Sequence, residues 1–178
     1  ASLGDISTAI ATASPIGTLV VTLTNGVCTE NITFNRDYVE ITASGGSLDA
    51  VDDAKPAIGF TARNVSIHDI SISGGVFNIG AFEGSTVALD AVTTSGSVYD
   101  DTLPITGVGV FADANSTITL HSANVITGGT DGTGLVALSN SSVRWLGSSN
   151  QIIAGSDSTN FDGPTALEVV QSSTLIQE

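Results

Sequence analysis

Two patterns of hydrophobic positions divide the chain. In DISTAIATA the apolar residues recur at the spacing of one helix face, at Ile6, Ala9, Ile10 and Ala13. Ser2 or Asp5 is placed to cap the start of this helix, and Pro15 ends it. From Gly17 onward, short alternating runs rich in Val, Ile, Thr and Ser are typical of β-strands. The sequence therefore predicts a helical N-terminal cap over 1–16 and β-structure over 17–178, within a single domain.

The strand segments repeat. NITFN, NVSIH, STVAL, STITL, SSVRW and STLIQ align at their first apolar residues, which are Ile32, Val65, Val87, Ile118, Val143 and Leu175. The intervals alternate between long and short, and the shortest, from Val65 to Val87, is 22 residues. That length suits one coil of a β-solenoid, whose coils bury their inner faces only by stacking. We therefore expect an all-β solenoid of about six coils, with Ile67, Leu89, Leu120 and Trp145 in one inward column.

Three acidic excursions interrupt the repeat. GSLDAVDDAKP begins at Gly46, GSVYDDTLP at Gly96 and GSDSTNFDGP at Gly155. Each joins the last strand of one coil to the first strand of the next, on every second coil. Insertions that gather on one face of a repeat protein often mark its binding face. The four N-x-S/T sequons, at Asn31, Asn64, Asn115 and Asn140, are interpreted as corner residues that form turns.

These features resemble the right-handed parallel β-helix of the pectin lyase-like superfamily. DISTAIATASPIGT and VVTLTNGVCTENITFNRDYVEIT resemble its N-terminal cap and first coil, and NVSIHDISISGG and STVALDAVTTSG resemble its coil repeat. The resemblance implies a fold rather than one activity. The superfamily includes pectate lyases, pectin lyases, polygalacturonases, epimerases, phage tailspikes and surface proteins without known catalysis. STLIQE lies midway through a sixth coil, so we expect a longer native chain, or a partner or self-association that covers the open edge.

The composition argues against some classes of binding partner. Four Lys and Arg residues stand against 18 Asp and Glu residues, and the net charge is -14. Nucleic acids and anionic membranes need a basic footprint, so neither is expected as a partner. The sequence has no run of about 18 apolar residues, so membrane insertion is not expected either. The acidic surface suits divalent cations or neutral sugars.

The aspartates of the excursions are candidate calcium ligands, because Ca²⁺ prefers carboxylate and carbonyl oxygens. The candidate set is Asp49, Asp52, Asp53, Asp100, Asp101, Asp157 and Asp162. No excursion matches the EF-hand pattern. Because Asp also begins turns ahead of Pro or Gly, turn formation is the alternative interpretation.

Two aromatic residues suggest sugar binding. Tyr99 stands beside Asp100 and Asp101, and Phe161 stands beside Asp162. An exposed ring with adjacent carboxylates can stack on a sugar face and accept its hydroxyl hydrogen bonds. The alternative is that each ring folds back onto the apolar surface of its own coil.

Catalysis is less well supported by the residue types. Polysaccharide elimination needs a strong base, and the best placed is Lys55, whose neighbouring aspartates favour its protonated form. Glycoside hydrolysis needs two carboxylates around one bond. His68 and His121, at the ends of two middle strands, are expected to face outward, but neither G-H-G nor R-I-K is present.

The sequence thus favours a secreted or cell-surface β-helix without an intrinsic enzyme site. Its expected partner is a polysaccharide or cell-surface glycan, recognised as an adhesin would recognise it, with calcium as a candidate aid. Two alternatives stay open. One is a lyase, hydrolase or epimerase domain or fragment that acts on polysaccharide, and the other is a structural stalk or a section of a trimeric spike.

Overall fold

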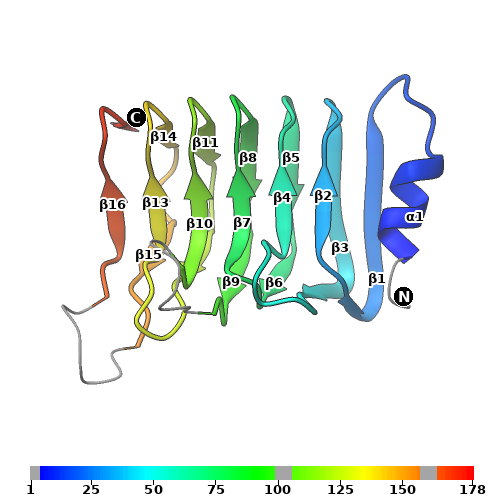
Figure 1. The fold of residues 1–178 in the computed structure, drawn as a ribbon, viewed down its shortest axis with the longest axis horizontal. Helices are drawn as coiled ribbons and strands as arrows, with labels where there is room; N and C mark the ends of the chain where they lie inside the picture. The colour runs from blue at the N-terminus through cyan, green and yellow to red at the C-terminus, as the bar shows by residue number, and fades with distance from the viewer. Residues whose placement is uncertain (1–4, 99–105, 157–163) are drawn as a thin grey trace.

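The computed structural model describes residues 5–98, 106–156 and 164–178, and it confirms the predicted parallel β-helix. Short parallel strands wind into coils that stack along one axis (Figure 1). A helix covers the N-terminal end of the stack. Two sheets, one of six and one of eleven strands, form the walls of the solenoid.

The N-terminal helix is held by a residue from the first coil. Helix α1 spans Asp5–Thr12 and is followed by the first strand, β1 (Leu19–Thr29). The buried carboxylate of Glu30 accepts hydrogen bonds from the backbone N–H groups of Ile6 and Ser7, each at 3.0 Å. A carboxylate suits this place because the first N–H groups of a helix lack partners within the helix. The side chains of the predicted caps, Ser2 and Asp5, lie outside the described part.

The six-stranded sheet faces the viewer in Figure 1. One strand from each of six successive coils contributes to it. These are β2 (Ile32–Phe34), β4 (Ile58–Phe60), β7 (Phe77–Ala81), β10 (Val108–Ala112), β13 (Leu135–Ala137) and β16 (Leu167–Val169).

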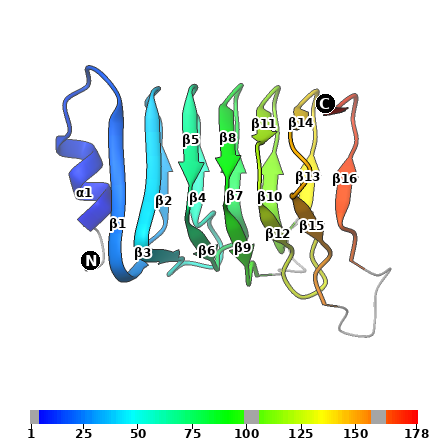
Figure 2. The same cartoon turned by 180° about the vertical axis from the view of Figure 1, so that it is seen from behind.

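The eleven-stranded sheet lies behind it and has two arms (Figure 2). The long strand β3 (Val39–Asp49) pairs with β1 along its length, with β5 over its first part and with β6 over its last part. The β5 arm contains β5 (Val65–His68), β8 (Thr86–Asp90), β11 (Thr117–Leu120), β14 (Ser142–Trp145) and β17 (Thr174–Gln177). The β6 arm contains β6 (Ser71–Ser73), β9 (Thr93–Ser95), β12 (Val125–Thr127) and β15 (Gln151–Ile153).

Inward side chains form columns along the solenoid axis, as predicted. Ile67, Leu89 and Leu120 occupy matching positions of successive strands, and each is fully buried. Trp145 continues this column and packs against the core while partly buried. Because each coil presents its apolar inner surface to the next, the core runs the length of the stack.

Buried serines satisfy the backbone at one corner of the coils. The Ser116 N–H donates to Ser141 Oγ, and the Ser141 N–H donates to Ser173 Oγ, both at 3.1 Å. Each hydroxyl thus bonds to the coil before it. Next to this corner, Asn64, Asn115 and Asn140 adopt the left-handed conformation, with φ of 57°, 64° and 61°. Asn tolerates that conformation better than most residues, which confirms the interpretation of these three sequons as turn residues.

A pair of buried asparagines serves the corner before the β6 arm. Asn124 Nδ2 donates to Asn150 Oδ1 at 2.8 Å and to the Leu89 carbonyl at 3.1 Å. Asn124 Oδ1 accepts from the Val92 N–H at 3.0 Å. The amide therefore ties three successive coils together within the core.

Two details of the predicted repeat are wrong. The partner of Val65 is Val39, whereas Ile32 pairs with Ile58 in the other sheet. Strand β2 alternates between buried and exposed residues, as the strands of the β5 arm do, whereas β4, β10 and β13 are buried on both faces. The alternation in NITF therefore resembles the wrong wall. In addition, β3 continues to Asp49, so the first excursion begins at Ala50 rather than at Gly46.

Candidate functional site

The first acidic excursion is anchored by a single asparagine. Asn31 Nδ2 donates to the carbonyls of Asp52 and Pro56, each at 2.9 Å. Its Oδ1 accepts from the N–H groups of Val51 and Asp52 at 3.0 and 2.7 Å. The sequon at Asn31 therefore has a structural role too, since its amide fixes the path of the loop.

Two of the predicted calcium ligands, Asp49 at the end of β3 and Asp52 in the loop, already have partners. Asp49 Oδ1 accepts from Ser73 Oγ at 2.8 Å. Asp52 Oδ1 accepts from the Ala54 N–H, while its Oδ2 lies 2.8 Å from Lys55 Nζ. The hydrogen bond from Lys55 and that from the Ala54 backbone lower the pKa of Asp52. Asp53 lies in the same loop, between β3 and β4.

The other predicted site residues are Tyr99, Asp100, Asp101, Asp157, Phe161 and Asp162, and all of them lie outside the described residues. In the sequence, these residues fall between β9 and β10 and between β15 and β16. In each pair the first strand belongs to the β6 arm and the second to the six-stranded sheet, so the connection is of the same kind as that of the first excursion. Over 5–98, 106–156 and 164–178, no three acidic, His or Cys side chains are arranged to hold one metal ion.

An aromatic cluster lies on the outer face of the six-stranded sheet. We call it the phenylalanine patch; its members are Phe77, Phe82, Val108, Phe111, Val136 and Leu138. Phe77 and Phe111 stack with ring centroids 4.4 Å apart and planes 10° apart. The Phe82 ring lies 5.8 Å from Phe111 at a tilt of 50°. Phe77 and Phe82 are only partly buried, so two of the three rings offer surface to solvent.

A glycine makes room for the patch. A Cβ at Gly80 would lie 2.6 Å from Cε2 of Phe82, which is closer than such contacts allow. The Phe82 ring therefore rests directly on the main chain of β7. Gly59 occupies the matching outward position on β4. Because Gly59 and Gly80 have no side chains, the outer face of the sheet is flat at these two neighbouring strands.

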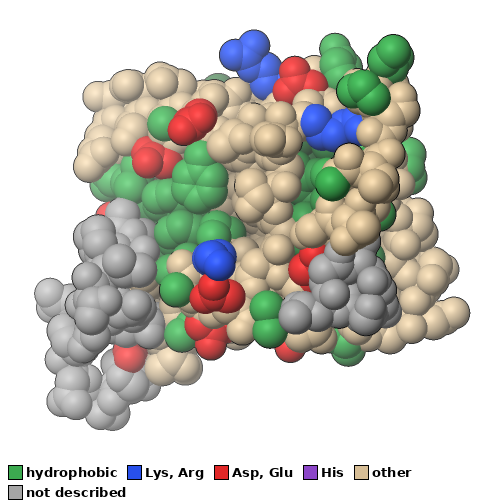
Figure 3. Space-filling view, turned by 45° about the vertical axis from the view of Figure 1, so that its right-hand side comes forward, with side chains coloured by type: hydrophobic (Ala, Val, Ile, Leu, Met, Phe, Trp, Pro, Cys, Tyr) green, Lys and Arg blue, Asp and Glu red, His purple; other side chains and the backbone are tan. Residues whose placement is uncertain are grey.

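Carboxylates border the patch. Glu83 follows Phe82 and is exposed, and Asp113 lies two residues after Phe111. The Asp52–Lys55 ion pair lies in the loop whose Pro56 approaches Gly59 and Gly80. Figure 3 shows hydrophobic side chains gathered on this side of the molecule, with acidic side chains above and an adjoining acidic and basic group below.

A second, polar group of side chains lies on the outer face of the β5 arm. His68, Asp90 and His121 occupy the same outward position on three successive coils, as expected for the two histidines. They line a shallow hollow of about 240 Å³ together with Ser66 and Ala88. Ala88 is the smallest outward residue of the group, and its short side chain leaves this space between larger neighbours.

Hydrogen bonds shift the pKa values of His68 and Asp90. His68 Nδ1 lies 3.2 Å from Asp69 Oδ2, and its Nε2 lies 3.1 Å from Glu40 Oε1. Bonding to Asp69 and then to Glu40 raises the pKa of His68, because both carboxylates favour the imidazolium form. The pKa of Asp90 is lowered, chiefly by the 2.7 Å hydrogen bond from Ser122 Oγ.

Comparison of the chain with known protein families, curated proteins and solved structures finds no match. Among the described helices, none has the length and apolar character that spanning a bilayer requires. The function must therefore be argued from the surface of the molecule.

The sequence contained a signal for the phenylalanine patch that alternation alone misses. The strand segments FNIGAF and GVGVFA carry apolar residues at inward and outward positions alike. A strand that is apolar on both faces is expected to be covered on both faces. The predicted repeat does not indicate the contact of Glu40 with His68, because it matches Val65 to Ile32, whereas the residue that pairs with Val65 is Val39.

Proposed function

We propose that this protein is a non-catalytic recognition domain that binds a polysaccharide or a cell-surface glycan through the phenylalanine patch. The observation that carries the proposal is the stack of Phe77 on Phe111, with Phe82 beside it and carboxylates at its border. Sugar rings have apolar C–H faces and hydroxyl edges. An aromatic surface contacts the face, and carboxylates accept hydrogen bonds from the hydroxyl groups.

The geometry of the solenoid supports an extended ligand. Neighbouring strands of a sheet generally lie about 4.8 Å apart, so one coil of the six-stranded sheet corresponds roughly to one pyranose unit of a straight chain. Phe77 is the first residue of β7, Phe82 follows its last residue, and Phe111 lies in β10 on the next coil. A glycan that runs along the axis would meet rings on consecutive coils.

The charge distribution supports recognition over elimination chemistry. Lys55 pairs with Asp52, and Arg144 pairs with Glu178 at 2.7 Å. The guanidinium of Arg36 donates to the carbonyls of Ser14 and Gly17. Three of the four Lys and Arg side chains are thus engaged, and a lyase needs a free base near its substrate.

Several finer assignments belong to the same proposal. The short helical cap and the stacked parallel coils support placing the chain with the pectin lyase-like superfamily. A glycan ligand implies a secreted or cell-surface location. The acidic excursions support calcium as an aid to binding. Self-association through the last coil is a further part of the proposal.

The test is a binding measurement on soluble polysaccharides. Neutral and uronic-acid polysaccharides would be titrated by calorimetry, with calcium and then with chelator, while cleavage products are assayed in parallel. We expect binding without cleavage, and we expect Phe77→Ala with Phe82→Ala to weaken it by about tenfold or more. Tyr38→Ala, which removes an exposed ring at a distant corner, is the matched control. Equal affinity in both variants, or release of products, would reject the proposal.

A further inference from the structure

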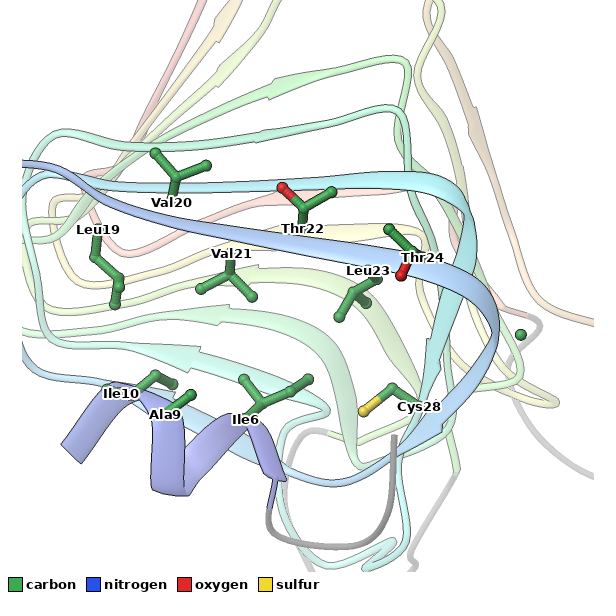
Figure 4. A pocket seen from close by; sticks show the side chains of 11 residues that line it. Ile6, Ala9, Ile10, Leu19, Val20, Val21, Thr22, Leu23, Thr24 and Cys28 are labelled. Atoms are coloured by element: carbon green, nitrogen blue, oxygen red, sulfur yellow. The ribbon is translucent and has the colours of Figure 1, made fainter. Parts of the chain in front are cut away.

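A cavity separates the N-terminal helix from the first coil. It measures about 460 Å³ and lies between α1 and β1. Ile6, Ala9 and Ile10 point into it from the helix, and Leu19, Val21 and Leu23 point into it from the strand (Figure 4). The residues that line it include no charged side chain.

Hydrogen bonds attach the start of the helix and the linker that follows it to the first coil. Glu30 bonds to the first turn of α1, next to Cys28 and the Leu23 end of the cavity. Arg36 bonds to the carbonyls of Ser14 and Gly17, in the linker that follows the Ile10 end. Ile6 lies in the buried core, and Ile10 packs against it from the other end of the helix. The cavity therefore lies between two elements whose positions are set by both hydrogen bonds and apolar contacts.

The cavity is open to solvent along part of its length. Ala9 is exposed even though its methyl group points toward β1, and Ile10, Leu19 and Val21 are only partly buried. Leaving such apolar surface in contact with water costs free energy that an apolar occupant would recover. The volume falls within the usual range of ligand pockets, and their lining is mainly apolar as well.

We propose that this cavity binds a single linear aliphatic chain, such as the tail of a fatty acid. The walls are a helix of eight residues, about 12 Å long, and a strand that runs beside it, so the space is elongated. An elongated apolar space fits an extended hydrocarbon chain better than a compact ring system. Because no charged side chain lines the cavity, the hydrocarbon chain is the part of the ligand that it recognises.

The experiment uses decanoate, whose extended length is similar to that of the helix. Calorimetric titration below the micelle concentration should give saturable binding, and the unfolding midpoint should rise with decanoate concentration. Ala9→Phe fills the cavity and should weaken binding by about tenfold or more. Ala11→Phe makes the same change at an exposed position that does not line the cavity, and it should bind as the unchanged protein does.

Each result decides the proposal. No saturable binding by the unchanged protein would overturn it, as would equal affinity of the Ala9→Phe and Ala11→Phe proteins. A higher unfolding midpoint for Ala9→Phe without decanoate binding to the unchanged protein would show that the cavity is only a packing defect. Decanol has the same hydrocarbon chain without the carboxylate, and it should bind with similar affinity because no charged side chain lines the cavity. No binding of decanol would overturn the proposal that the chain is the recognised part.

Discussion

The two outer faces of this solenoid are built on the same coils and differ in chemistry. The face of the six-stranded sheet carries three phenylalanine rings, whereas the face of the β5 arm carries His68, Asp90 and His121 around a hollow. The inward positions of the same strands are apolar in both walls, mostly Val, Ile, Leu and Ala, with Phe34 and Phe60 in the six-stranded sheet and Trp145 in the β5 arm. The comparison shows that stacking constrains the inside of each coil and leaves the outside free. Function is therefore to be sought in the outward residues.

We expect the largest change in the free energy of unfolding from a substitution at an inward position, compared with a substitution at the adjacent outward position of the same strand. Leu89 is fully buried, and Ala88 beside it faces the hollow. Leu89→Ala should lower the free energy of unfolding by about 2–5 kcal/mol, because it leaves a cavity in the inward column. Ala88→Ser should change it by less than about 0.5 kcal/mol. Denaturant titration measures both, and similar losses in the two variants would contradict the distinction between the faces.

Substitution of a buried polar residue should destabilise the protein, as substitution of an inward apolar residue does. Asn124→Ala removes the partner of the Val92 N–H and of Asn150 Oδ1, both in the interior. We expect a loss of about 2–3 kcal/mol, since unsatisfied buried polar groups keep their full desolvation cost. Asn140→Gly, at an exposed left-handed corner, is the control, and it should stay within about 0.5 kcal/mol of the unchanged protein. Comparable stability of both variants would show that the asparagine pair does not join the coils.

A substitution in the phenylalanine patch should change glycan affinity more than it changes the free energy of unfolding. Phe82→Ala removes a partly exposed ring that contacts Phe111 edgewise, so we expect a loss of only about 1 kcal/mol in unfolding free energy. The same change should have its main effect on glycan affinity. Thermal unfolding and calorimetric titration of one protein preparation measure the two quantities. A loss of stability as large as that of Leu89→Ala would mean that the patch belongs to the core.

The smallest effect is expected from titration of the β5 arm. Because the pKa of His68 is raised above 6.5, its ion pairs stabilise the fold fully below pH 6.5 and lose this contribution as the pH rises through the folded-state pKa. The contribution of such a partly exposed group should be below about 1 kcal/mol. The unfolding midpoint, followed from mildly acidic to alkaline pH, should fall over this window. His68→Gln should flatten that fall, and an unchanged profile would show that the bonds to Glu40 and Asp69 carry no net energy.

The sequence predicted the features that follow from the periodic spacing of apolar residues. The helix near Ile6, the inward column from Ile67 to Trp145 and the outward histidines all follow from repeats of 3.6 or 2 residues. It did not predict the wall to which NITF belongs, because β2 alternates as the strands of the β5 arm do, unlike the doubly buried β4, β10 and β13 of its own sheet. Nor did it predict the helix cap by Glu30 or the ring stack of Phe77 on Phe111. Those contacts join residues on different coils, and their partners depend on register rather than on local pattern.

The constant spacing of the coils also bears on how the chain reaches its structure. Val65, Val87 and Ile118 each pair with the equivalent residue one coil away, so no strand must find a partner across the whole chain. The entropy of closing each coil is similar, and each coil that has formed offers a template for the next. We therefore expect folding to start within any adjacent pair of coils and to extend from there. Growth toward the N-terminus stops where α1 covers the first coil, so that the helix sets a boundary to propagation.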